Sequence, residues 1–378
     1  MENLNVGDIS AFQDLAERFS KKEIAPLALE KDRYPFADFQ EEAVKVAASV
    51  GLLGMTLPEK YGGMGQGMRA LGAVLEVIAR ADASMAAVIL TQALARAVII
   101  ELGPPETAEK WVALEKDGIT LLLAFPLYED PENLPESVSA KRDGNSFKLD
   151  GAIGYLACLP VARAVIVPAK IADTGKSGFF LVETTMKGMT VSEPVVSLGL
   201  RGCPAADLEL KNVSVPSSNQ LGGEDGDKKF VEAVEHFRGP LAAIALGILH
   251  GAYSASLNYT KDRYQAKKQI IEHHMVRGML SQMVSWIDIA SPAVAHACLT
   301  ADRDEICSAS ELLSIQEIVT MAATRATTDA VQTLGGYGYM HEYGQEKRMR
   351  DAKQLQAVFG SSRTRIMNVM DRQLQTSG

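Results

Sequence analysis

The feature that most constrains the fold is a periodicity of apolar residues that changes twice along the 378-residue chain. Up to about residue 117, apolar residues recur every three to five positions or form Ala-rich runs, which is typical of helices. From 118 to 222 the apolar runs are short, β-branched or aromatic, and separated by Gly, Pro and Asp, which is typical of strands. From 223 onward the helical pattern returns. The sequence therefore predicts an N-terminal helical domain (1–117), a central β-domain (118–222) and a C-terminal helical domain (223–378).

The predicted elements follow from these patterns. Helices are predicted over residues 10–30, 38–53, 68–103, 106–116, 230–264, 269–299, 306–334 and 344–374. Strands are predicted over residues 119–127, 146–153, 162–170, 177–183 and 207–216. The spacing of these strands is typical of an antiparallel sandwich or barrel.

Composition excludes several classes of protein. The 38 basic and 47 acidic residues give a formal charge of −9, which disfavours nucleic acid as a partner because such binding depends on phosphate neutralisation. The four cysteines form no CxxC pair, and the six histidines form no HExxH motif, so we expect neither a disulfide scaffold nor a metal site. No uninterrupted apolar run reaches the roughly 18 residues of a membrane span, and the N-terminal stretch lacks a secretion signal. We therefore expect no membrane span and a cytoplasmic location.

Four segments together resemble the acyl-CoA dehydrogenase family, and the resemblance covers nearly the whole chain. They are GLLGMTLPEKYGGMG (51–65), EVIARADASMA (76–86), GLRGCPAADLELKNVSVP (199–216) and VQTLGGYGYMHEYGQEKRMRDAK (331–353). The last is the longest and the most specific. The resemblance implies an α+β multidomain fold with an N-terminal helical domain, a small central antiparallel β-barrel and a C-terminal four-helix bundle.

The resemblance also implies a chemistry, in which flavin adenine dinucleotide (FAD) oxidises an acyl-CoA thioester. In the family a carboxylate removes the α-proton while the β-hydrogen leaves as hydride to the flavin. A general base must lie within reach of that proton, and the protein must orient the cofactor. An electron-transfer flavoprotein is the kind of partner that such an enzyme implies.

The catalytic base of the family is missing from both positions where relatives carry it. The residue that follows the Arg350-Asp351-Ala352 motif at the usual distance is Phe359, and the alternative position, just before Arg238, is Phe237. A phenyl ring accepts no proton. The sequence therefore predicts that the isolated chain does not catalyse ordinary α,β-dehydrogenation.

The segments that face the flavin ring in the family also differ here. The Thr-Glu-Pro-Gly-Ala-Gly-Ser-Asp run of the family corresponds to residues 125–132, and its Trp-Ile-Thr run corresponds to Tyr155-Leu156-Ala157. Loss of the hydroxyl donors would leave a buried polar ring system unsatisfied. The resemblance assigns Glu235, Arg238 and Tyr155 to substrate contacts.

The residues that family members offer to the flavin of a neighbouring subunit are better retained. They are Arg263, Gln332, Gly335 and Gly336, and the resemblance adds Ser361 to the cofactor-binding set. Glycine permits the close approach of backbone to a ligand. One departure is the pair Ala266-Lys267, which stands where the family has Phe-Gly.

The segments that face the chain's own flavin ring are altered, whereas the residues offered to a neighbour are retained. This pattern resembles that of the heterotetrameric acyl-CoA dehydrogenases, in which two related chains alternate and only composite sites hold flavin. Our leading hypothesis is a degenerate subunit that pairs with a related active chain, or with itself. It would complete an FAD and acyl-CoA site, with FAD shared with or held by the partner and none in the isolated chain.

Three alternatives remain open from sequence. The first is an acyl-CoA-binding lyase, hydratase or isomerase without flavin, in which Tyr155, Glu129, Asp130 or His236 serves as acid or base. The second is a flavin dehydrogenase whose base has moved to another wall of the pocket. The third is a binding or scaffold role without catalysis.

Overall fold

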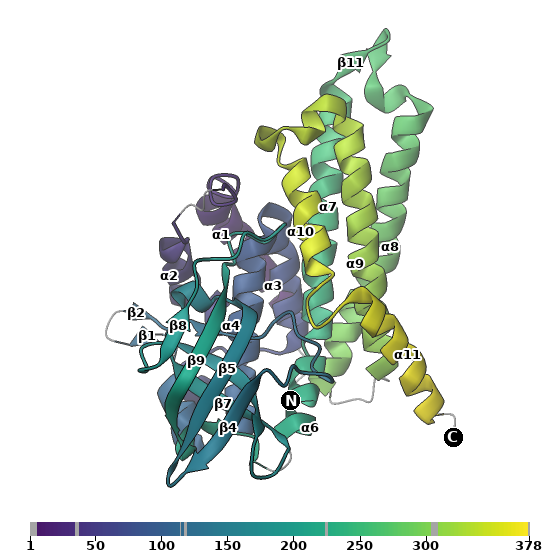
Figure 1. Cartoon of the computed structure of the whole chain (residues 1–378). Coiled ribbons are helices and arrows are strands. Elements are labelled where there is room, and N and C mark those ends of the chain that lie inside the picture. Colours follow the sequence, from purple (N-terminus) through teal and green to yellow (C-terminus); the bar gives the residue numbers. More distant parts are fainter. Residues whose placement is uncertain are drawn as a thin grey trace.

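The computed structural model confirms the predicted order of helices, strands and helices (Figure 1). It describes residues 6–34, 38–113, 115–116, 119–223, 226–303 and 309–376. The helices are α1 (Val6–Phe19), α2 (Glu41–Ser49), α3 (Met68–Ala81), α4 (Ala83–Leu102), α5 (Pro105–Trp111), α6 (Gly226–Glu235), α7 (Arg238–Asp262), α8 (His274–Arg303), α9 (Ala309–Leu334), α10 (Gln345–Leu355) and α11 (Ser362–Thr376). The strands are β1 (Glu115–Lys116), β2 (Ile119–Thr120), β3 (Leu123–Ala124), β4 (Val138–Asp143), β5 (Ser146–Ala157), β6 (Ala164–Ile171), β7 (Ser177–Glu183), β8 (Met189–Val191), β9 (Ala205–Pro216), β10 (Gln220–Leu221), β11 (Tyr264–Gln265) and β12 (Lys268–Gln269).

Three segments that were predicted as single helices are each divided in two. The clearest case is 68–103, which Asp82 divides into α3 and α4 because its backbone is extended (φ −153°, ψ 113°). The Asp82 carboxylate accepts a hydrogen bond from the Ser84 N–H at 3.0 Å and so caps α4. The sequence did not predict this boundary because the Ala-rich residues on both sides of Asp82 are all typical of a helix. Segments 230–264 and 344–374 are likewise divided, into α6 with α7 and α10 with α11.

The central sheet is not purely antiparallel as predicted. Its strands follow the order β10-β7-β6-β4-β5-β9-β8, and β3 pairs separately with β6. The pairs β3–β6 and β4–β6 are parallel, whereas the other pairs in this sheet are antiparallel. Sequence periodicity missed β4 because only two of its six residues are buried.

Strand β6 shows how the sheet connects two hydrophobic cores. Successive side chains of a strand point to opposite faces. Ala164 and Ile166 pack in the large core that the sheet shares with the helices, whereas Val165 and Val167 pack in a second core within the β-domain. A strand buried on both faces reads as a continuous apolar run, as ARAVIVPAK does.

The C-terminal helices α7, α8, α9 and α10 pack against one another as a bundle, from which α11 projects (Figure 1). Two apolar helical segments, Ala83–Leu102 and Gly226–Asp262, are long enough to cross a membrane. In the most apolar stretch of each segment, 89% and 72% respectively is buried, so both segments are core helices of this fold.

A buried ion-pair triad joins all three parts of the chain. The Lys347 ammonium on α10 lies 2.7 Å from Asp82 at the α3–α4 junction and 2.6 Å from Asp351. Asp351 in turn accepts a 2.7 Å hydrogen bond from the Leu200 N–H, in the loop before β9. Burial disfavours the charged form of both carboxylates. At Asp82 the Lys347 charge outweighs burial and holds the pKa below its usual range, whereas the pKa of Asp351 stays raised.

Replacing Lys347 with methionine should lower the free energy of unfolding at pH 7 by about 3–5 kcal/mol, because two buried carboxylates would lose their cation. Without Lys347 both carboxyl pKa values would exceed their unfolded values, so this loss should shrink as the pH falls toward 5. Urea unfolding at pH 5 and pH 7 measures both effects. Lys353→Met, at an exposed position on the same helix, is the matched control. A loss below about 1 kcal/mol, or one that grows at pH 5, would contradict the role of the triad.

Candidate functional site

The predicted site residues lie at the two opposite ends of helix α7. Phe237 immediately precedes this 25-residue helix and Arg263 immediately follows it. At 1.5 Å per residue the helix separates them by about 37 Å. In Figure 1 the start of α7 lies beside the sheet, whereas the β11–β12 hairpin that follows α7 lies at the far tip of the bundle. The chain therefore contains two separate candidate sites, named here the Phe359 site and the Arg263 pocket.

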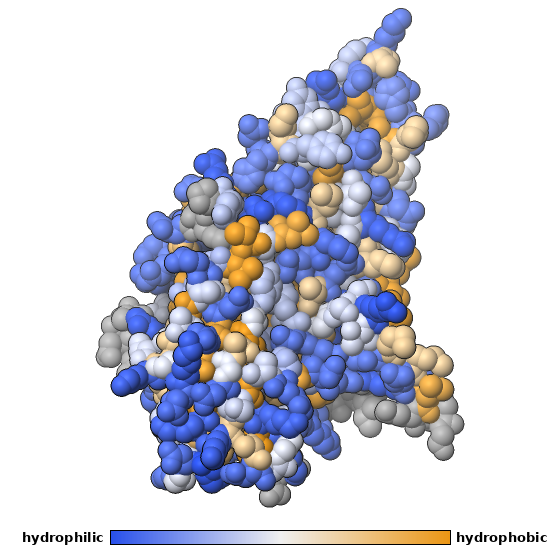
Figure 2. Space-filling view, viewed as in Figure 1, coloured by the Kyte–Doolittle hydropathy of each residue, from blue (hydrophilic) through white to orange (hydrophobic). Residues whose placement is uncertain are grey.

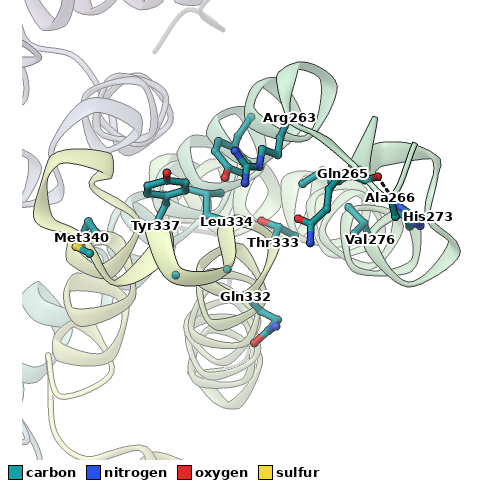
Figure 3. A pocket seen from close by; sticks show the side chains of 14 residues that line it. Arg263, Gln265, Ala266, His273, Val276, Gln332, Thr333, Leu334, Tyr337 and Met340 are labelled. Atoms are coloured by element: carbon teal, nitrogen blue, oxygen red, sulfur yellow. Dashed lines mark hydrogen bonds between the residues drawn. The ribbon is translucent and has the colours of Figure 1, made fainter. Parts of the chain in front are cut away.

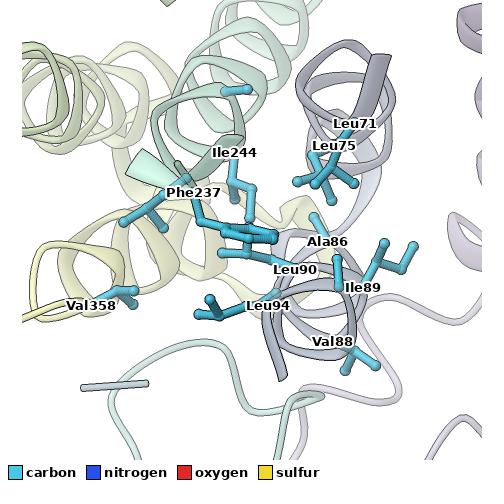
Figure 4. Close-up of a cluster of buried hydrophobic side chains, with 14 of the residues drawn as sticks. Leu71, Leu75, Ala86, Val88, Ile89, Leu90, Leu94, Phe237, Ile244 and Val358 are labelled. Carbon is cyan, nitrogen blue, oxygen red and sulfur yellow. The ribbon is translucent and has the colours of Figure 1, made fainter. Parts of the chain in front are cut away.

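The Phe359 site is the region around Phe359, Phe237, Leu127, Tyr128 and Tyr155. Phe237 is 1% exposed, and its ring points into the hydrophobic core among the side chains of Leu90, Leu94 and Ile244 (Figure 4). Phe359 is also buried, with φ of 58°. The residues at both positions predicted for the family's base are thus core side chains.

The segments expected to face the flavin ring are bonded directly to each other. The Phe359 N–H donates to the Leu127 carbonyl at 2.9 Å. Phe125 and Ala157 exchange two backbone hydrogen bonds of 3.2 and 3.0 Å. The segments predicted to face the ring are thus paired with one another through their backbones.

Two tyrosines complete the Phe359 site. The rings of Tyr128 and Tyr155 meet edge to face with centroids 4.6 Å apart. The Tyr155 hydroxyl accepts a 3.0 Å hydrogen bond from the Gln354 amide on α10. Burial raises the pKa of both tyrosines, so both hydroxyls remain protonated at neutral pH.

The predicted substrate contacts Glu235 and Arg238 pair with each other. Their closest nitrogen and oxygen atoms are 2.8 Å apart, and Arg372 on α11 also contacts Glu235, at 3.2 Å. Burial disfavours the Glu235 charge, but the two arginines outweigh burial and hold its pKa below the usual range. Arg238 donates a further 2.6 Å hydrogen bond to the Gln316 side chain on α9. These charges satisfy one another without a ligand.

Sequence reasoning missed a second buried arginine at the same end. Arg365 on α11 is 3.0 Å from the Glu317 carboxylate and donates to the carbonyls of Gln356, Val358 and Gly360. It therefore fixes the turn that carries Phe359. No motif marks Arg365, since an arginine in an amphipathic helix ordinarily faces solvent.

Ser361 lies beside this turn rather than in the Arg263 pocket. Its hydroxyl is 2.8 Å from that of Thr364 and accepts a 3.2 Å hydrogen bond from the Thr364 N–H. These contacts are typical of a residue at a helix N-terminus, here that of α11.

The Arg263 pocket is a cavity of about 650 Å³ at the tip of the bundle (Figure 3). Arg263, Gln332, Gly335 and Gly336 all line it, so the structure brings together the four residues predicted to face a neighbouring subunit. The Arg263 guanidinium lies 5.8 Å from the centre of the Tyr337 ring. The pocket thus combines a positive charge with an aromatic wall.

Gly336 has a local environment that does not itself require glycine. Gly335 has φ of 59°, which favours glycine, but Gly336 has no such φ. A Cβ at Gly336 would meet no atom within 4 Å. A molecule that approaches the backbone closely from outside the chain would explain a glycine there.

The turn beside the pocket is strained. Ala266 and Lys267 link β11 to β12 with φ of 52° and 66°. Two-residue hairpin turns with positive φ at both positions favour Asn and Gly. Backbone strain of this kind is common at functional sites.

Lys267→Gly should therefore increase the free energy of unfolding by about 1 kcal/mol, because glycine adopts positive φ without steric cost. Chemical denaturation measures the change. The neighbouring Lys268→Gly is the control: this strand residue has no positive φ, so we expect a loss of about 0.5–1 kcal/mol. Equal destabilisation by both substitutions would contradict the strain at Lys267.

Within the described part of the chain, one cluster could in principle hold a metal ion. It consists of Asp32, His341 and Glu346. However, the two ring nitrogens of His341 contact Glu346 at 3.1 Å and the Leu29 carbonyl at 2.9 Å. Arg350 pairs with both carboxylates. This arrangement is a hydrogen-bonded ion-pair network.

Comparison with known proteins identifies the family. Residues 8–114 match the N-terminal domain model of acyl-CoA dehydrogenases, and residues 224–374 match the C-terminal domain model. The chain belongs to the acyl-CoA dehydrogenase family. One relative is the cyclohex-1-ene-1-carbonyl-CoA dehydrogenase of Geobacter metallireducens, 31% identical over 92% of this chain and 93% of the relative.

Solved structures of family members agree with the fold. Butyryl-CoA dehydrogenase from Megasphaera elsdenii superimposes with a TM-score of 0.89 and 27% identity, over 98% of this chain and 100% of that chain. A chain in a structure described as the electron transferring flavoprotein of Acidaminococcus fermentans superimposes with a TM-score of 0.90 and 26% identity, over 99% of both chains. Acyl-CoA dehydrogenases normally bind FAD and act on acyl-CoA thioesters.

Proposed function

We propose that this chain is the flavin-poor subunit of a heteromeric acyl-CoA dehydrogenase. In this proposal its Arg263 pocket receives the nucleotide half of FAD that a related, catalytically competent subunit holds. The observation that carries the proposal is the contrast between the two ends of α7. The segments of the Phe359 site are bonded to each other, whereas the Arg263 pocket is open and lined by a cation, an aromatic ring and glycines.

The separation of these ends supports a shared site. A flavin placed in the Arg263 pocket would lie about 37 Å from the Phe359 site of the same chain. Its ring would therefore lie against another subunit. That subunit would supply the carboxylate base, because the residues at both positions predicted for a base in this chain are phenylalanines, Phe237 and Phe359.

The chemistry of the pocket suits the nucleotide half of a dinucleotide. The Arg263 guanidinium can form two parallel hydrogen bonds to a phosphate group. Gly336 leaves space for backbone to approach a ligand closely. In this assembly the acyl-CoA thioester and the electron acceptor, an electron-transfer flavoprotein, would bind at the partner's half of the composite site.

Helix α11 offers a surface on which subunits can associate. Figure 2 shows apolar residues along the projecting helix α11. Its exposed large apolar side chains are Ile366, Met367, Met370 and Leu374, each 56–60% exposed. Such a contiguous apolar surface is typical of a protein–protein interface.

The test is Arg263→Gln in this chain, co-expressed with each acyl-CoA dehydrogenase-type chain encoded in the same genome. Flavin affinity of the purified complex should fall about 10–100-fold, since a hydrogen bond from a charged donor contributes about 1.5–3 kcal/mol. Fluorescence of released flavin measures the affinity. Arg277→Gln, at an exposed position on α8 that does not line the pocket, is the matched control.

Two results would contradict the proposal. One is a complex whose flavin affinity is unchanged by Arg263→Gln. The other is the absence of any stable complex with related chains, accompanied by stoichiometric flavin in the isolated protein.

A further inference from the structure

A pair of buried thiols lies beside the Phe359 site. The sulfur atoms of Cys158 and Cys203 are 3.8 Å apart, and both side chains are buried. Cys158 directly follows β5, and Cys203 lies two residues before β9. The Cys158 N–H donates to the Pro204 carbonyl at 2.7 Å, next to the antiparallel pair Ala157–Ala205. The two cysteines therefore lie on adjacent chain segments held in register by backbone hydrogen bonds.

We propose that Cys158 and Cys203 form a reversible disulfide, and that this pair is a site of oxidative modification by small disulfides such as oxidised glutathione. A disulfide needs a sulfur–sulfur distance of about 2.05 Å. The two sulfurs must therefore approach by less than 2 Å, which rotation of the two side chains can supply while the backbone pairing holds.

The exchange is balanced. One thiolate attacks the small disulfide, forms a mixed disulfide and releases one small thiol. The second cysteine then attacks the mixed disulfide and releases the second small thiol. Overall, the two S–H bonds of the protein thiols and the S–S bond of the oxidant break. One protein S–S bond and the S–H bonds of two small thiols form. Two electrons pass from the protein sulfurs to the oxidant.

The surroundings control the rate of this exchange. Contact with Cys158 and burial raise the pKa of the Cys203 thiol, so this thiol stays protonated while the loop is closed. The thiolate is the reactive form. Oxidation therefore requires local opening of the segment from Gly199 to Pro204, and the disulfide is shielded from reductants once that segment closes.

The position of the pair links it to the rest of the fold. The loop that contains Cys203 also contains Leu200, which bonds to Asp351 on α10. Gly199 in the same loop lies so close to the Arg350 carbonyl that a side chain has no space there. A disulfide would therefore join the end of β5 to the loop that contacts the C-terminal bundle, close to Tyr128 and Tyr155.

The experiment uses the full chain carrying Cys307→Ser, which leaves Cys158, Cys203 and Cys298. Incubation with oxidised glutathione, followed by digestion without reductant and mass spectrometry, should yield one linked peptide pair containing Cys158 and Cys203. The intact mass should fall by about 2 Da, and Tm should rise by about 5 °C. Dithiothreitol should reverse both changes.

Matched variants assign the linkage. Cys158→Ala and Cys203→Ala should each abolish the linked peptide and the Tm rise, whereas Cys298→Ala should keep both. Low urea should accelerate oxidation, and urea-unfolded chain serves as the positive control for detection. The proposal is overturned if the folded chain retains both thiols after days with oxidant while the unfolded chain forms the disulfide. It is also overturned if Cys298 is the dominant partner of either cysteine.

Discussion

Lys347 holds together the three parts of this protein. A lysine ammonium buried between two carboxylates is costly to desolvate, and it persists because Asp82 and Asp351 supply the opposite charge at 2.7 and 2.6 Å. Asp82 simultaneously caps α4, and Asp351 simultaneously receives the Leu200 N–H. The N-terminal helices, the β-domain and the bundle thus share one charged contact. Together with the large hydrophobic core that the helices share with the sheet, this junction fixes how the three parts meet.

The two ends of helix α7 have different properties. At the Phe359 site, backbone hydrogen bonds and the charges of Glu235, Arg238 and Arg365 are satisfied within the chain. At the other end, Arg263 lines an open pocket and lies near the Tyr337 ring. The proposed loss of flavin binding at the Phe359 site rests on this internal bonding in addition to the two phenylalanines at the predicted base positions.

Periodicity was sufficient to predict the order of helices, strands and helices, and the family motifs were sufficient to predict four residues that meet in the Arg263 pocket. Those four residues are Arg263 and three residues within 332–336, and they could be named because the surrounding segments resemble the family. Periodicity located most helices and strands but not their breaks, because the Asp82 cap interrupts an otherwise uniform Ala-rich run. The roles of Gln316 and Arg365 could not be predicted, since each depends on partners brought together only by tertiary packing. The bond between Phe359 and Leu127 joins residues 232 positions apart and leaves no local signal.

Flavin sharing is tested most directly by the visible absorption spectrum of the purified chain, alone and co-purified with a related subunit, with flavin counted per chain. We expect a colourless isolated chain and a yellow complex that holds about half the flavin per chain of a conventional acyl-CoA dehydrogenase, since one of the two ring sites would hold no flavin. An isolated chain that carries one flavin per subunit would contradict this expectation, because the Phe359 site would then have to open to admit the ring.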